Sequence, residues 1–232
     1  MQVPLCSRTL LSNKIKYPRL LGLWLFEIPS ALHSINNEEK SWVEKLPSQK
    51  AWQYHFSRGC TRNALSEISG VDPLAIPLIA PPSKPPKLAN GWGHISISHC
   101  KDALMIAWST QKIGIDIERS NRRFAAEKIA NRYFCESEKE KLRHIRNEQK
   151  SSYVLERWVV KEASIKWQEG KIADNLSQWE WNKTSSLAFN HSLKCGVSIY
   201  QSIYNNWIFA IACNAYTHPE QPIICITKNI NK

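Results

Sequence analysis

Apolar segments between breaker residues predict a strand, a long helix and an extended crossing in the first part of the chain. The apolar run 21–26 lies between Pro18 and Pro29, as expected of a buried strand. In residues 49–68, apolar and basic side chains mix at helical spacing, which predicts a helix with one core stripe and one cationic face. Residues 73–86 contain six prolines and are expected to cross the surface as extended chain, because proline breaks helix interiors.

The middle of the chain is predicted to form strands followed by helices. Three short apolar segments, separated by turn-like residues, predict a meander of antiparallel strands at 95–98, 103–109 and 113–118. The highly charged segment 136–145 and the longer amphipathic segment 151–168 are typical of helices.

Strand patterns return in the C-terminal part, at 193–200, 207–213 and 223–226. Both halves of the chain therefore follow the order strand, helices, strands. This order is typical of an α+β protein, and it leaves a duplicated architecture open.

The size of the chain permits one large domain or two fused halves, since 232 residues with 43% hydrophobic content can bury a substantial core. The longest early apolar run, 20–28, is interrupted by Glu27 and is far shorter than the ~20 residues that span a bilayer. Basic residues precede this run, but no small-residue cleavage pattern follows it, which argues against a signal peptide.

Charge and cysteine usage narrow the classes of partner and compartment. The 31 basic residues exceed the 20 acidic ones, and the net charge of +11 favours nucleic acid, anionic membranes, phosphorylated small molecules or acidic proteins as partners.

The seven cysteines are scattered along the sequence, and no two of them form a Cys-x-x-Cys pair. This argues against a disulfide framework and a structural zinc site, and it is typical of a reducing cytosol.

The segment 114–118, with the sequence GIDIE, carries the first candidate site. On a strand, Asp116 and Glu118 point to the same side while Ile115 and Ile117 pack into the core. Two carboxylates so close repel each other, and an all-oxygen pair suits Mg²⁺ or Ca²⁺ better than zinc. The alternative is a plain strand with a solvated acidic face.

The segment 157–167 carries the second candidate site. On a helix, Trp158, Glu162 and Lys166 follow one another at four-residue steps, so an aromatic ring, a carboxylate and an ammonium share one stripe. The order Glu then Lys also suits a plain surface ion pair worth ~0.3–0.5 kcal/mol, which is the alternative interpretation.

The segment 95–100 places Ser98 and His99 at the end of a predicted strand. A histidine beside a hydroxyl at such a position can bind phosphate or act as a base. The alternative is a polar turn. A nucleophilic serine is not indicated, because no Gly-x-Ser-x-Gly elbow is present.

Together, these three segments resemble the 4′-phosphopantetheinyl transferase superfamily, specifically its larger monomeric type that acts on carrier proteins. That family shows a Ser-His motif, a Gly-(Ile/Val)-Asp-Ile-Glu motif and a Trp-x-x-Lys-Glu-(Ala/Ser)-x-x-Lys motif in this order, and here they read SISHC, GIDIE and WVVKEASIK. The Gly170-Lys171-Ile172 that follows is similar to the family's Gly-Lys-Gly-Leu, with the second glycine lost. The resemblance covers about residues 84–172.

The resemblance implies an enzyme that moves the phosphopantetheine arm of coenzyme A to a carrier serine and releases 3′,5′-ADP. Asp116, Glu118 and Glu162 are the implied ligands of Mg²⁺, which would also grip the diphosphate. Glu162 is the implied base for the serine hydroxyl. Lys166 is placed to stabilise or protonate the leaving oxygen, and Lys161 to contact the phosphates.

The resemblance also implies contacts to the 3′-phosphate of coenzyme A from Ser98, His99 and Lys84. Before Lys84, Ser83 replaces the glycine of the family's Gly-Lys-Pro. Further cationic contacts are expected from the N-terminal half, with solvated helix positions as the alternative; the candidates are Arg58 and Arg62 and, more weakly, Lys45 and Lys50.

On this family analogy, the fold is α+β with two similar α/β halves, residues 1–111 and 112–232, related by a pseudo-twofold axis around a coenzyme A cleft. A cytoplasmic monomer acting on an acidic apo acyl or peptidyl carrier protein is expected, without nucleic acid or membrane partners. The first alternative is a basic nucleic-acid-binding protein, favoured by the charge and ten tryptophans. The second is an inactive coenzyme A-binding relative, against which the intact carboxylates argue.

Overall fold

The computed structural model describes residues 21–214 and 226–228, and the chain divides into two compact units. The described part of the second unit consists of Ser98–Lys101 and residues 111–214, and the first unit contains the other described residues. Both units combine helices with a mostly antiparallel sheet, so the α+β class is confirmed. No helix in the described ranges has both the length and the apolar character needed to cross a membrane.

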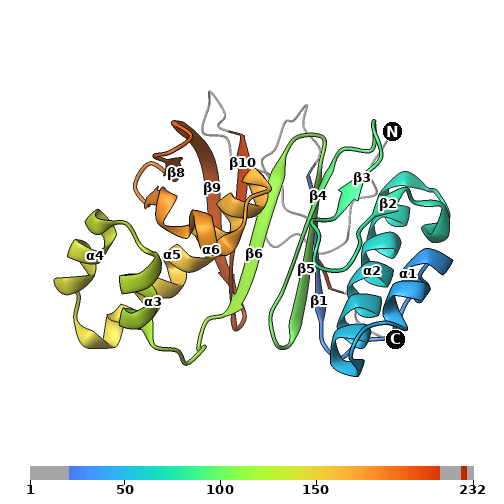
Figure 1. The fold of residues 1–232 in the computed structure, drawn as a ribbon, viewed down its shortest axis with the longest axis horizontal. Coiled ribbons are helices and arrows are strands. Elements are labelled where there is room, and N and C mark those ends of the chain that lie inside the picture. The colour runs from blue at the N-terminus through green and yellow to red at the C-terminus, as the bar shows by residue number, and fades with distance from the viewer. Residues whose placement is uncertain (1–20, 215–225, 229–232) are drawn as a thin grey trace. The chain divides into compact units, whose positions relative to one another are not determined.

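The first unit packs one long helix against a four-stranded sheet (Figure 1). Its elements are β1 (Leu21–Glu27), α1 (Asn37–Val43), α2 (Ser48–Ser69), the 3₁₀ turn η1 (Pro73–Ala75), β2 (Leu78–Ile79), β3 (Lys87–Leu88), β4 (His94–His99), β5 (Ala103–Ser109) and β11 (Ile226–Lys228). The sheet order is β11-β1-β5-β4, and the last two residues of β4 count with the second unit. Apolar side chains of α2, among them Phe56 and Ala64, meet Trp24 and Leu104 of the sheet in the core.

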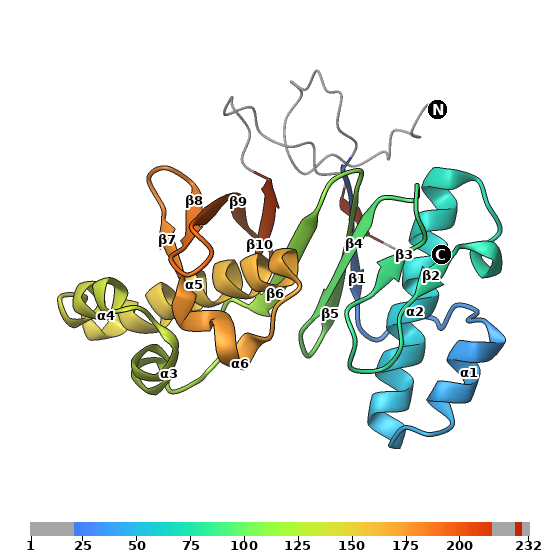
Figure 2. The same cartoon turned by 45° about the horizontal axis from the view of Figure 1, so that its top comes forward.

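The second unit packs another 22-residue helix against a five-stranded sheet. Its elements are β6 (Ile113–Arg119), α3 (Ala126–Tyr133), α4 (Glu136–Arg143), α5 (Asn147–Gln168), α6 (Ile172–Asn175), η2 (Leu176–Gln178), β7 (Trp179–Asn182), β8 (Leu187–Asn190), β9 (Cys195–Tyr204) and β10 (Trp207–Asn214). The sheet order is β6-β10-β9-β8-β7, and Val159 and Ala163 of α5 pack on its inner face. Figure 2 shows α3 beside α5.

Strand pairing departs from the predicted topology in two places. The segments of the predicted meander are all strands, but β6 pairs with β10 and so belongs to the other sheet. Strand β11 pairs in parallel with β1 of the first unit, although residues 112–232 are expected to form one half. Local patterns predict that a segment is a strand but not its distant partner, which is the physical reason for both differences. Of the predicted strand 223–226, residues 223–225 lie outside the described ranges.

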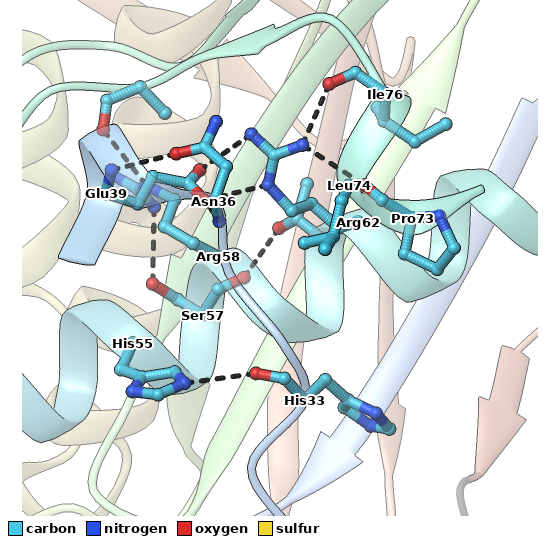
Figure 3. Close-up of polar contacts among 12 residues, drawn as sticks. His33, Asn36, Glu39, His55, Ser57, Arg58, Arg62, Pro73, Leu74 and Ile76 are labelled. Carbon is cyan, nitrogen blue, oxygen red and sulfur yellow. Dashed lines mark hydrogen bonds and ion pairs between the residues drawn. The ribbon is translucent and has the colours of Figure 1, made fainter. Parts of the chain in front are cut away.

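A buried ion pair joins the two helices of the first unit (Figure 3). Arg62 of α2 donates from Nε to Oε2 of Glu39 at 2.8 Å and from Nη2 to Oε1 at 3.1 Å. Its Nη1 donates to the backbone oxygens of Pro73 and Ile76 at 3.1 and 2.8 Å. Glu39 also accepts from the backbone N–H of Asn36, which closes the capping box of α1. Arg62 therefore ties α1 and η1 to α2.

Arg58, one turn before Arg62, is likewise buried. Its Nε donates to the backbone oxygen of Ala80 at 3.1 Å, and its guanidinium lies 4.6 Å from the ring centre of Tyr54. Oxygens within the first unit engage both guanidinium groups, so Arg58 and Arg62 have structural contacts here, and their expected coenzyme A contacts stay a prediction. The weaker candidates Lys45 and Lys50 are exposed.

We expect the substitution Arg62→Met to lower the free energy of unfolding by about 3–5 kcal/mol, because it leaves the carboxylate of Glu39 buried without its cation. Chemical denaturation followed by tryptophan fluorescence measures this change. The matched control Lys50→Met alters an exposed lysine of the same helix and should change stability by no more than about 0.5 kcal/mol. The double variant Glu39→Gln/Arg62→Met removes both charges and should recover most of the loss; a single variant as stable as the wild type contradicts this role.

Candidate active site

A close approach of α5 to β6 brings the GIDIE and WVVKEASIK segments together. A Cβ atom at Gly114 of β6 would stand 2.0 Å from the backbone oxygen of Ala163 and 2.3 Å from the backbone nitrogen of Trp167. Backbone atoms of a packed helix cannot yield by that amount, so only glycine fits. The absent side chain lets the α5 segment with Glu162 and Lys166 lie directly against the strand with Asp116.

The alternation of β6 directs its carboxylates to the face that α5 covers. Asp116 lies opposite Ala210 of β10, and Glu118 opposite Ile208. These two partners belong to the core cluster formed with α5, so the acidic side chains share its face of the sheet. Ile115 and Ile117 point to the other face and are also buried.

Asp116 is almost fully buried and lies in a small polar cluster. Its Oδ1 accepts hydrogen bonds from Ser98 Oγ at 2.6 Å and from Lys166 Nζ at 2.8 Å. The same ammonium donates to Ser98 Oγ at 2.8 Å and lies 4.0 Å from Oε2 of Glu162. The other oxygen of Asp116, Oδ2, is buried without a hydrogen-bond partner in the part of the chain that the structure describes. One oxygen of this carboxylate is thus engaged and the other is available.

Burial and neighbouring carboxylates raise the proton affinity of Glu162 and Glu118. Burial raises the pKa of Glu162 to about 8, and the negative charge of Asp116 adds to this effect, while Lys166 opposes it. Burial also raises the pKa of Glu118, against the opposing charge of Arg122, with which Glu118 forms an ion pair. Among the described residues, the cluster therefore contains three carboxylates but only two neighbouring cations, Lys166 and Arg122.

The carboxylate oxygens of the cluster are the kind of ligand that a hard divalent cation prefers. All donors are carboxylate oxygens, Oδ2 of Asp116 lacks a partner, and a cation would relieve the repulsion that raises the Glu162 pKa. Within the described ranges, however, no group of three or more His, Cys, Asp or Glu side chains stands ready to hold a metal ion. In this arrangement Lys166 neutralises Asp116 and Arg122 neutralises Glu118.

The remaining predicted residues have different environments. His99 is exposed at the end of β4, whereas the neighbouring Ser98 is buried with its hydroxyl engaged in the cluster. Lys84 is exposed in the first unit and follows Ser83, whose φ of 61° is left-handed. Glycine adopts this conformation most readily, so Ser83 holds a backbone conformation that favours glycine.

Lys161 does not contact a ligand-accessible surface. Its side chain is fully buried, and its ammonium lies 2.7 Å from Oε2 of Glu138. It also donates to the backbone oxygens of Leu176, at 3.1 Å, and Trp179. The sequence around Glu138 does not indicate this role. Glu138 is the third residue of α4, a position where glutamate commonly takes part in helix capping. Lys161 therefore has a structural role in this arrangement, and its expected phosphate contact stays a prediction.

We expect Gly114→Ala to push α5 away from β6 and to destabilise the protein by about 3 kcal/mol, because the new methyl group meets backbone atoms. Thermal unfolding measures this loss. The matched control is Gly196→Ala in β9, where the nearest atom to the new Cβ is 3.6 Å away, and it should leave stability nearly unchanged. Equal stabilities of the two variants would show that the approach at Gly114 is not a constraint.

A family model matches the part of the chain that contains β6 and α5. Residues 112–212 match the family model described as the 4′-phosphopantetheinyl transferase superfamily. This match includes the GIDIE and WVVKEASIK segments but not Ser98, His99 or Lys84.

No curated protein matches the chain. A solved structure that resembles it is the holo-[acyl-carrier-protein] synthase AcpS of Thermotoga maritima, with 20% identity, a TM-score of 0.34 and coverage of 44% of this chain. The matching part spans 61% of that relative's length. Residues 112–212 of this chain are therefore similar to the 4′-phosphopantetheinyl transferase superfamily.

Proposed function

We propose that this protein transfers 4′-phosphopantetheine from coenzyme A to a serine of an apo carrier protein, with Mg²⁺ as its cofactor. The family supports the reaction class. The observation that carries the proposal is the buried Asp116, which presents a partnerless carboxylate oxygen beside Glu162 and Lys166. A base, a cation and a metal-binding oxygen are the groups that phosphoryl transfer to a hydroxyl requires.

The reaction forms a bond between the serine oxygen and the β-phosphorus of coenzyme A and breaks the bond from that phosphorus to the departing 3′,5′-ADP. Glu162 is the proposed acceptor of the serine proton. Lys166, one helical turn further, supplies positive charge to the leaving oxygen. The two groups share one stripe of α5, so the helix orients both toward the same reacting atoms.

Asp116 and Glu162 would hold the Mg²⁺, with Glu118 as the third carboxylate once its pairing with Arg122 is exchanged for the cation. When bound, the ion would offset the charge that develops on the diphosphate oxygens. Lys166, which pairs with Asp116 in this structure, would then be available to the phosphate. The exposed His99 is the proposed contact for the 3′-phosphate, and the exposed Lys84 remains a cation available to an anionic ligand.

The proposed protein partner is an acidic carrier domain. The net charge of +11 produces a field that attracts both such a domain and the polyanionic coenzyme A. The nucleic-acid alternative loses part of its support, because Trp207 is buried and Trp108 and Trp158 pack against the cores. An acidic carrier and coenzyme A explain the charge without requiring exposed stacking surfaces.

We expect the purified protein, mixed with coenzyme A, Mg²⁺ and apo carrier proteins, to add one phosphopantetheine group to the carrier serine. Intact-protein mass spectrometry detects the product, and a carrier with alanine at the acceptor serine is the control. Fatty-acid and peptide-synthetase carriers should be tested in parallel. Absence of the mass increase on every carrier of such a panel would refute the proposed activity.

We expect Asp116→Asn and Glu162→Gln each to reduce turnover by about 10²-fold or more, because each removes a charge that the metal and the proton transfer require. Both changes keep the size of the side chain, so the fold should remain. Glu140→Gln, at an exposed carboxylate of α4, is the matched control and should retain wild-type turnover. Near-normal activity of either site variant means that the carboxylate roles are misassigned.

A further inference from the structure

We propose that Ser98 is a positioning residue for the metal-binding carboxylate of Asp116, and not a contact for the 3′-phosphate of coenzyme A. This inference rests on the proposed function, because it concerns the same site. It starts from the placement of the Ser98 side chain, which is buried with 3% of its surface exposed. A phosphate contact requires an accessible hydroxyl with a hydrogen to donate.

The hydrogen-bonding capacity of Ser98 is used within the protein. A serine hydroxyl has one hydrogen to donate and two lone pairs that accept. Ser98 Oγ donates to Oδ1 of Asp116 at 2.6 Å and accepts from Lys166 Nζ at 2.8 Å. The backbone N–H of Ile117 donates to the same oxygen at 3.4 Å. These three contacts leave no donor for a phosphate oxygen.

The contacts of Ser98 determine which oxygen of Asp116 is available. Ser98 and Lys166 both bind Oδ1, so the carboxylate is held from one side. Oδ2 is then the buried oxygen without a partner and the one presented to a cation. Ser98 also holds the ammonium of Lys166 at a fixed place, 4.0 Å from Glu162 Oε2. A single hydroxyl thus orients a proposed metal ligand and a proposed catalytic lysine.

The neighbouring residue provides a matched comparison. His99 follows Ser98 on β4 and is exposed, as expected from the alternation of side chains along a strand. The Ser-His motif therefore separates into an inward residue that positions Asp116 and an outward residue that suits a phosphate. Substitution of Ser98 should therefore weaken metal binding, whereas substitution of His99 should weaken recognition of the 3′-phosphate.

The first measurement is the affinity of the protein for Mn²⁺ without coenzyme A, followed by electron paramagnetic resonance. We expect Ser98→Ala to weaken Mn²⁺ binding by about 10–100-fold, as for other residues that orient metal ligands. Ser98→Thr keeps the hydroxyl and should retain most of the affinity. His99→Ala should leave Mn²⁺ binding unchanged, because that side chain is on the outer side of the strand end.

The second measurement compares coenzyme A with dephospho-coenzyme A, which lacks the 3′-phosphate. We expect Ser98→Ala to lower kcat/KM by the same factor for both substrates, because the metal site is needed with either one. His99→Ala should impair transfer from coenzyme A only. If the Ser98→Ala defect disappears with dephospho-coenzyme A, Ser98 is a phosphate contact and the inference is overturned.

The two measurements separate the failure of this inference from failure of the proposed function. Unchanged Mn²⁺ affinity in Ser98→Ala overturns the positioning role, whatever the activity of the wild type. A wild-type protein that binds no Mn²⁺ overturns both. Weaker Mn²⁺ binding in Ser98→Ala together with an inactive wild type supports the role of Ser98 and refutes the transferase.

Discussion

The close approach of α5 to β6 is the constraint on which the candidate site depends. At Gly114 the backbone of the helix occupies the space that any side chain would need. Because the helix lies so close, Glu162 and Lys166 come within electrostatic reach of Asp116. A displacement of α5 by the radius of one methyl group would separate these groups, since interactions between charges and hydrogen bonds weaken steeply with distance.

The cluster around Asp116 balances charge in a way that suits a metal-dependent site. Burial and the proximity of two further carboxylates raise the proton affinity of Glu162, while Lys166 and Arg122 supply two positive charges. The structure thus shows Lys166 paired with Asp116 and Arg122 paired with Glu118, with Glu162 as a third carboxylate. Under the proposed function, Asp116, Glu118 and Glu162 would hold Mg²⁺, and Ser98 would keep Asp116 oriented.

Among the described residues, buried ion pairs outside this cluster also have structural roles. Arg62 with Glu39 ties the helices of the first unit, and Lys161 with Glu138 joins α5 to α4 in the second. Both cations also donate to backbone oxygens, which compensates the cost of their burial. Lys161 stands next to Glu162 in the sequence, yet the two side chains serve different parts of the molecule, because adjacent residues of a helix point in different directions.

The sequence alone determined the α+β class, the segments that form most strands and helices, and the pairing of Asp116 with Glu118 on one face of a strand. Such features follow from local periodicity and motif order. Only the tertiary structure decided that β6 pairs with β10, that Arg62 and Lys161 are buried, and that Ser98 contacts Lys166 across 68 positions of the chain. Burial and side-chain pairing depend on residues that are distant in sequence, and a local pattern carries no record of them.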